Sequence, residues 1–151
     1  MMDHIDKKIL NILQEDDKVS YHKIAKKIRM SASTVHSRVK KMKQDGIIKN
    51  FSAIIEPKKV GYNSMALIGL TVNANKMREV AKTLSLYKEM QIVSTSTGDH
   101  DLVALVLAKD EKDLWRFVNQ KIKTIDGING RIDVSSFLDV YKFNYGIPIV
   151  N

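Results

Sequence analysis

Residues 20–46 constrain the fold more than any other stretch, because they contain two amphipathic helical patterns separated by a very short break. The first pattern starts at Ser20, a residue type favoured at helix N-caps, and its apolar residues recur at Ile24, Ala25 and Ile28. This spacing predicts a helix with one buried face. Arg29 and Met30 break the pattern, which predicts its end.

The second pattern begins at Ser31 and ends at Gly46. The Ser31 hydroxyl can accept from the free amides of the first turn, and glycine readily adopts the left-handed conformation that ends a helix. Val35, Val39 and Met42 form the expected buried stripe. Two helices joined by a turn of about three residues form the helix-turn-helix pattern.

The outward face of the second helix changes character along its length. At about 100° per residue, the side chains on this face are Ser33, Ser37, Lys40 and Gln44 at its centre, with Thr34, His36, Lys41 and Lys43 beside them. Short polar side chains let a helix backbone approach base edges in a major groove, and lysines behind them reach phosphates. The alternative is a solvated basic helix with no ligand.

The net charge of +8 is concentrated in the first part of the chain. Residues 1–61 contain 14 Lys/Arg and 7 Asp/Glu, whereas residues 62–151 contain 11 and 10. Nine basic residues and no acidic residue occur from Lys18 to Lys43. This pattern indicates a polyanionic partner, and double-stranded DNA fits better than a membrane surface because no apolar ridge accompanies the basic residues.

Composition excludes several other classes of protein. The chain has 151 residues, of which 44% are hydrophobic, enough for one domain or two small ones with real cores. It has no uncharged apolar run of about 18 residues and no signal-like N-terminus, so we expect a cytoplasmic protein without a membrane segment. Zero cysteines exclude disulfides and thiolate metal sites. We expect neither a metal nor a cofactor.

The segment before Ser20 completes a small first domain. Asp3 is expected to cap a helix whose apolar stripe runs from Ile5 to Leu13. The resulting three-helix unit, residues 1–50, is near the lower size limit for folding alone, so it should lean on a neighbour or a partner chain.

A short connection separates this domain from the rest. The run 47–55 has the composition of a strand and predicts either a wing hairpin or one extended strand. Pro57 and Gly61 then mark a boundary. We therefore expect a linker strand or hinge at 51–62 and a second domain at 63–151.

The second domain has the order strand, helix, strand, strand, helix, strand. The strands are predicted at 65–72, 91–97, 102–108 and along Ile132, Val134, Leu138 and Val140. One helix has Met77, Val80, Ala81 and Leu84 on its buried face, and the other is capped by Asp110. This βαββαβ order predicts an α+β, ferredoxin-like sandwich with both helices on one face of a four-stranded antiparallel sheet. The strands are apolar on both sides, so a second copy is expected to cover the other face.

With both halves in view, the whole chain resembles the Lrp/AsnC, or feast/famine, family of transcriptional regulators. The residues that carry the resemblance are Asp3, Asp6, Ile9, Leu10, Leu13, Asp16, Ser20, Ile24, Ala25, Ile28, Ser31, Val35, Arg38, Val39, Met42 and Gly46–Ile48, with a Gly-x-x-Asp loop at Gly98–Asp101. The resemblance implies a homodimer that often assembles into octamers. It also implies control by an amino acid bound between dimers near that loop.

The family's DNA-binding residues map onto both helices of the motif. The resemblance implies base contacts from Ser33, Thr34, His36 and Ser37, phosphate contacts from Lys40, Lys41 and Lys43, and backbone contacts from Tyr21, His22, Lys23 and Lys26. A dimer would read a pseudo-palindromic operator with half-sites about one helical turn apart. Arg38 has two interpretations, a structural pair with Asp3 or Asp6 or a base contact.

The family's effector loop corresponds to Thr97, Gly98, Asp99, His100 and Asp101, whose amides and carboxylates would hold an amino acid. The alternative is a simple hairpin turn. Many relatives have an aromatic residue where this chain has His100, and often threonines on the last strand where it has Arg131 and Asp133. This charged pair would either recognise a polar ligand side chain or close the pocket as a salt bridge.

Two other functions share the same architecture. Siroheme decarboxylases are built on a similar two-domain arrangement, so an enzyme is one alternative. Against it, the four histidines, at positions 4, 22, 36 and 100, are scattered, and no nucleophile–base motif occurs. The other alternative is a DNA-binding protein that ignores amino acids or coats DNA without specificity.

Overall fold

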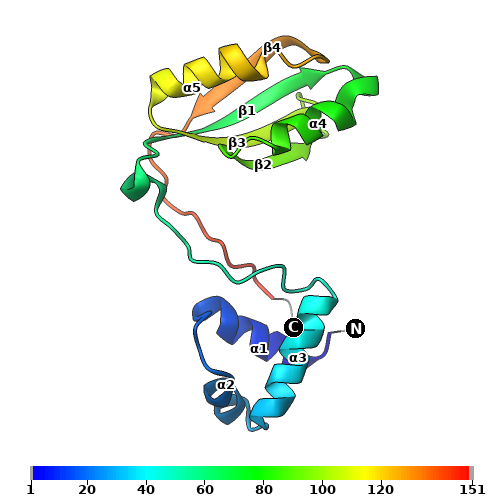
Figure 1. The fold of residues 1–151 in the computed structure, drawn as a ribbon, viewed down its shortest axis with the longest axis vertical. Coiled ribbons are helices and arrows are strands. Elements are labelled where there is room, and N and C mark those ends of the chain that lie inside the picture. The colour runs from blue at the N-terminus through cyan, green and yellow to red at the C-terminus, as the bar shows by residue number, and fades with distance from the viewer. Residues whose placement is uncertain (1, 150–151) are drawn as a thin grey trace. The chain divides into compact units, whose positions relative to one another are not determined.

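The computed structural model describes residues 2–149, which form two compact units (Figure 1). The first unit runs to Ile54 and also takes in the C-terminal tail from Lys142, whereas the second unit is Ile55–Tyr141. Each has its own hydrophobic core. Residues 1 and 150–151, which the predicted domains include, lie outside the described residues. Across 2–149, no helix combines the length and the hydropathy needed to cross a bilayer.

The first unit contains the three predicted helices. They are α1 (His4–Glu15), α2 (Tyr21–Ile28) and α3 (Ala32–Gln44). The side chains of Asp3, Ser20 and Ser31 each accept a hydrogen bond from the backbone N–H three residues later, which confirms all three predicted N-caps.

The turn between α2 and α3 is short because Arg29 takes the left-handed conformation, with φ of 57°. This lets the Met30 N–H donate to the Ala25 carbonyl and end α2 within one residue. After α3, Gly46 has φ of 72°, as its predicted role at the end of this helix requires. The core of the unit consists of Ile9, Leu13, Ile24, Ala25, Val35, Val39, Met42 and Ile48.

The connection after α3 differs from the prediction. Within the described residues, 47–56 form neither a hairpin nor a paired strand, and Pro57–Val60 is a 3-10 helix. Strand composition alone is insufficient because a strand needs a partner for its backbone groups. Ile48 is buried in the core of the first unit, but Ile54 and Ile55 are 69% and 57% exposed, so the end of this run is uncovered within the described residues.

The second unit has the predicted βαββαβ order. Its elements are β1 (Ser64–Val72), α4 (Met77–Ser85), β2 (Met90–Thr95), β3 (Leu102–Ala108), α5 (Glu111–Phe117) and β4 (Ile128–Ser136), with a 3-10 turn at Ala74–Lys76 and a π-helical turn at Val118–Ile122. The sheet order is β2-β3-β1-β4 and every pairing is antiparallel. The ferredoxin-like prediction is confirmed.

Both helices pack on one face of this sheet (Figure 1). Alternate residues of β1, such as Ile68 and Leu70, are fully buried against them because side chains in a strand alternate between faces. The opposite face is also apolar. Leu67, Ile92 and Phe137 are 43%, 53% and 40% exposed.

Two strand ends differ from the sequence prediction. The Phe137 N–H donates to the Met65 carbonyl as the last backbone bond beside β4, so Leu138 and Val140 lie beyond its partner strand and are 88% and 47% exposed. Strand β2 ends at Thr95 rather than residue 97, since the chain then enters a loop. Alternating apolar residues cannot extend a strand past its partner.

The first turn of α5 ties two strands together. The Glu111 carboxylate accepts hydrogen bonds from the Ser64 hydroxyl at 2.7 Å and the Ser136 hydroxyl at 2.9 Å. Ser64 starts β1 and Ser136 ends β4. One carboxylate therefore fastens both strands at the same end of the sheet.

Candidate nucleic-acid interface and effector loop

Helix α3 presents the polar and basic face that its sequence predicts. Val35 and Val39 are fully buried, whereas the side chains one step around the helix are exposed. The exposed set is Ser33, His36, Ser37, Lys40, Lys41, Lys43 and Gln44. In the described part of the chain, Lys40 and Lys41 take part in no salt bridge, so their charges are available to an external anion.

Three hydroxyl groups cluster at the start of α3. The Ser31 oxygen lies 2.7 Å from the Thr34 oxygen and 2.9 Å from the Ser33 oxygen, and it also accepts from the Thr34 N–H. Thr34 is half-buried, so its hydroxyl supports the N-cap more than it faces solvent. Ser33 remains exposed beside the free amides of the helix N-terminus.

Helix α2 flanks this surface with the four residues predicted to contact the DNA backbone. His22, Lys23 and Lys26 are exposed. Tyr21 is half-buried, and its ring meets that of His36 edge-to-face, with centroids 5.6 Å apart. This contact places the start of α2 against the outward side of α3.

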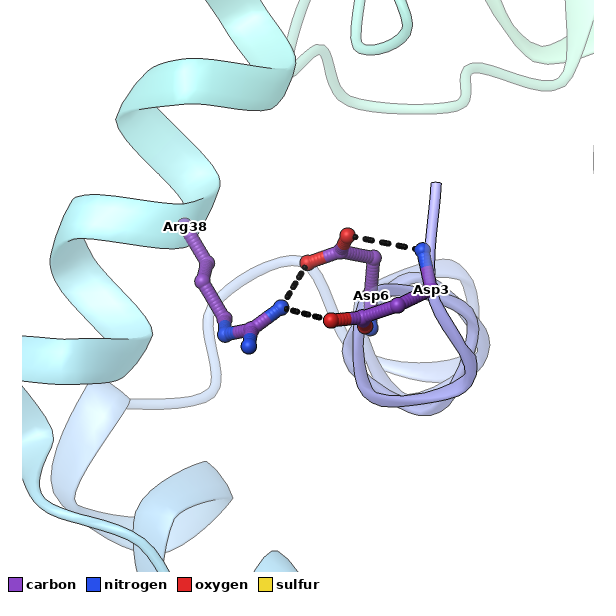
Figure 2. Close-up of polar contacts among 3 residues, drawn as sticks. All are labelled: Asp3, Asp6 and Arg38. Atoms are coloured by element: carbon purple, nitrogen blue, oxygen red, sulfur yellow. Dashed lines mark hydrogen bonds and ion pairs between the residues drawn. The ribbon is translucent and has the colours of Figure 1, made fainter. Parts of the chain in front are cut away.

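Arg38 fastens α3 to the start of α1. Figure 2 shows its Nη1 between two carboxylates, at 2.7 Å from Asp3 and 2.8 Å from Asp6. Asp3 and Asp6 also cap each other's backbone N–H in a capping box. The structure therefore has the predicted structural pair, and it includes both aspartates.

This network changes the ionisation of its members. Hydrogen bonds from the Asp6 backbone N–H and from Arg38 lower the pKa of Asp3 to about 2. The same carboxylates, Asp6 first, raise the pKa of Arg38. Both charges are held at neutral pH because each partner stabilises the ionised form of the other.

The loop predicted to bind an effector, Thr97–Asp101, is closed by backbone bonds. The Ser96 N–H donates to the Asp101 carbonyl, and the Asp101 N–H donates to the Leu70 carbonyl, both at 2.9 Å. The Asp101 carboxylate accepts from the Val72 N–H at 2.8 Å, at the irregularity in the β1–β4 pairing. Asp101 therefore anchors the loop to β1, while Thr97, Gly98 and Asp99 remain exposed.

His100 lies over Gly69 of β1. A Cβ at Gly69 would overlap the imidazole of His100, so glycine leaves room for the ring where it lies. Its Nε2 is 3.7 Å from Asp133 Oδ2, and Arg131 Nε is 2.5 Å from Asp133 Oδ1. The structure thus brings together three of the predicted effector residues.

Gly69 was not among the sequence candidates. A glycine inside an otherwise apolar strand is a signal for close approach of another group, and it could have marked this position. The approaching group itself is visible only in the fold, because His100 is 31 residues farther along the chain.

Residues 2–149 contain no cluster of three or more His, Cys, Asp or Glu side chains able to hold a metal ion. The two regions do contain a basic helix surface and a loop with exposed residues beside an imidazole, a carboxylate and a guanidinium.

Comparison with known proteins agrees with both halves of this description. Residues 2–49 match the model of a winged helix-turn-helix DNA-binding domain, and residues 62–149 match the PF0864 C-terminal dimeric alpha+beta barrel domain. The fold and the motif define a transcriptional regulator with a helix-turn-helix and an AsnC-type regulatory domain.

Two relatives from Pyrococcus furiosus extend the match over nearly the whole chain. An uncharacterised HTH-type transcriptional regulator is 41% identical over 96% of this chain and 97% of its own. The HTH-type transcriptional regulator FL11 is 37% identical over 99% of this chain and 97% of its own. The chain belongs to the Lrp/AsnC family of transcriptional regulators. These relatives are regulators rather than enzymes, as the sequence predicted.

Solved structures share the fold. Escherichia coli AsnC is 28% identical with a TM-score of 0.88, covering 95% of this chain and 96% of AsnC. The transcriptional regulator NMB0573 of Neisseria meningitidis, solved as an L-Met complex, is 23% identical with a TM-score of 0.90, covering 98% and 97%. At that identity the second comparison shows the fold alone.

Proposed function

We propose that this regulator binds a pseudo-palindromic DNA operator as a dimer, with α3 of each copy in the major groove. The observation that carries the proposal is the exposed face of α3, where hydroxyl side chains precede Lys40 and Lys41, which form no salt bridge with any described residue. Base contacts come from Ser33, His36 and Ser37, with Thr34 supporting the N-cap. Phosphate contacts come from Lys40, Lys41 and Lys43, together with Tyr21, His22, Lys23 and Lys26 of α2.

The open face of the sheet supports dimerisation. Leu67, Ile92 and Phe137 lie exposed on the side of the sheet that no helix covers, and burying them against a second copy is favourable. Leu67→Glu should give a monomer in sedimentation velocity, while the exposed Leu86→Glu on the helix side should not. An oligomer unchanged by Leu67→Glu would contradict this interface. Higher assembly to an octamer would appear in the same experiment.

The DNA proposal is tested by selecting operators from a random duplex library and titrating variants at several salt concentrations. Lys40→Ala should weaken binding to every sequence and reduce the slope of log affinity against log salt by about 0.9 per lost phosphate contact, hence about 1.8 for a dimer. Ser37→Ala should keep the slope and change the preferred sequence.

Lys82→Ala is the matched control, because Lys82 is an exposed lysine on α4 of the second unit. It should leave both the affinity and the slope as in wild type. If Lys40→Ala and Lys82→Ala give the same slope, α3 does not contact phosphate through Lys40. A wild-type protein with no preferred duplex would overturn the regulator's sequence specificity.

We also propose that the loop Thr97–Asp101 senses an amino acid. Thr97 and Asp99 are exposed and their amides can bind the ligand carboxylate, whereas the Gly98 N–H already donates to the Ser96 hydroxyl at 3.2 Å. Arg131, Asp133 and His100 form a contact network beside the loop. Asp101 holds the loop in place through Val72. A panel of the twenty amino acids in a thermal-shift assay tests this, since a ligand at 100 times its Kd stabilises by about 2.7 kcal/mol.

The competing function is a regulator without an effector. One observation favours it: Asp133 already contacts both His100 and Arg131, so its carboxylate has partners without a ligand. In that case none of the twenty amino acids would raise the unfolding temperature, and DNA binding would be unaffected by all of them.

A further inference from the structure

The C-terminal tail, residues 142–149 of the described chain, belongs to the first unit, although the family match over residues 62–149 includes it in the regulatory domain. The contact is specific. The Gln14 side chain of α1 donates from Nε2 to the Ile147 carbonyl at 3.1 Å, and its Oε1 accepts from the Ile147 N–H at 2.7 Å. One side-chain amide therefore satisfies both backbone groups of one residue.

This geometry resembles one hydrogen-bonded residue pair of an antiparallel β-sheet. Opposed residues in an antiparallel pair exchange two N–H···O bonds, and a glutamine amide presents the same donor and acceptor side by side. Glutamate has no donor, so glutamine suits this position. Gln14 thus acts as a one-residue strand partner for the tail.

The residues around Ile147 favour the backbone conformation that this contact requires. Pro148 follows it, and a residue before proline favours the extended conformation. On the other side, the Gly146 N–H donates to the Asn144 side chain at 3.0 Å, which shapes the turn before it. Gly146, beside the Gln14 side chain, is partly covered, whereas every residue from 137 to 145 and Ile147 itself are exposed, so the two hydrogen bonds to Gln14 rather than burial hold Ile147.

We propose that Gln14 holds the C-terminal tail as a second tether on the DNA-binding unit. The chain already joins the two units once, at residues 54–55, and it joins them again at 141–142. A unit held by one linker reorients freely, whereas a unit held at both ends of its fold has fewer accessible orientations. The tether also continues directly from β4, the strand that carries Arg131 and Asp133.

The test uses the full-length protein and needs no DNA. Amide hydrogen exchange and ¹⁵N relaxation are measured for wild type, Gln14→Ala and Gln14→Glu, with Asn11→Ala as the control at an exposed polar site on the same helix. In Gln14→Ala the Ile147 amide should exchange about fivefold faster or more. The amides of α1 to α3 should report a shorter rotational correlation time.

Gln14→Glu keeps the acceptor but loses the donor, so its exchange rate at the Ile147 amide should lie between those of wild type and Gln14→Ala. Exchange at the buried Val39 amide should stay unchanged in all variants, which separates release of the tail from loss of the fold. The proposal is overturned if the Ile147 amide is unprotected in wild type, or if Gln14→Ala behaves like Asn11→Ala in both measurements.

A second arm rests on the proposed function. With an operator selected for the wild-type protein, inserting two base pairs between half-sites should weaken wild-type binding more than Gln14→Ala binding, because a looser unit tolerates altered spacing. Equal losses would show that the tether does not act in DNA recognition. If no operator is found, the proposed function fails, while the exchange and relaxation data still decide the tether.

Discussion

Replacing Arg38 by methionine should destabilise the first unit without changing the exposed face of α3. The Arg38 side chain is 29% exposed and the Asp6 side chain 15% exposed, with 2.8 Å between Nη1 and Oδ1. A hydrogen bond to a charged group is worth about 1.5–3 kcal/mol when shielded, whereas an exposed ion pair contributes about 0.2–1 kcal/mol. Partial solvent access places the Arg38–Asp6 contact near the boundary of these ranges, at about 1.5 kcal/mol.

The loss arises because methionine fills the volume of the arginine stem but offers no donor. The Asp6 carboxylate would then stay partly buried beside Asp3 with no cation between them. A loss of about 1.4 kcal/mol changes an equilibrium tenfold. The buried amides of Val35 and Val39 should therefore exchange about tenfold faster where exchange requires opening of the unit.

The assay is native-state hydrogen exchange by NMR, which reports on the first unit separately from the sandwich. Lys40→Met is the matched control, because Lys40 lies on the same helix with an exposed side chain. Lysine, arginine and methionine also have similar helix propensities. Lys40→Met should change the exchange rates of these amides by less than twofold, which corresponds to about 0.4 kcal/mol. Equal rates in Arg38→Met and Lys40→Met would refute the stabilising role of the network.

Three further predictions concern other contacts. The pKa of Asp3 is lowered from 3.8 to about 2, so its contribution is complete above about pH 4 and is lost as pH falls toward 2; the urea midpoint of wild type should drop across this window more than that of Asp3→Asn. Glu111→Ala removes the acceptor of the Ser64 and Ser136 hydroxyls and should cost the second unit about 1–3 kcal/mol in urea unfolding, with Ser136→Ala costing less. Gly69→Ala should displace the His100 ring, seen as loss of its nuclear Overhauser contacts to β1, whereas Gly98→Ala in the same loop meets only an ordinary 3.7 Å contact and should leave the ring in place.

Local patterns in the sequence were sufficient for the helices and for the strand order. Helix caps depend on a side chain and a backbone N–H three residues apart, so Asp3, Ser20 and Ser31 could be identified without tertiary information. The buried stripe of α3 also leaves its basic face outward by geometry alone. The predicted exposure of Lys40 and Lys41 follows from that periodicity.

Strand limits and the wing could not be read in the same way. The run 47–55 and the residues Leu138 and Val140 have strand composition, yet a strand ends where its partner ends. Only the pairing of β4 with β1 decides that β4 stops at Ser136. The choice between the two interpretations of Arg38 likewise depended on where α1 packs.

What the sequence alone determined is therefore the set of elements, their caps and the concentration of positive charge, because these depend on residues within a few positions of one another. Tertiary structure decided which side chains meet. Gln14 and Ile147 are 133 residues apart, and Arg38 lies 32 residues from Asp6. Such contacts exist only after the chain has folded back on itself. They fix the position of α3, of the tail and of the loop, which no local pattern in the sequence can predict.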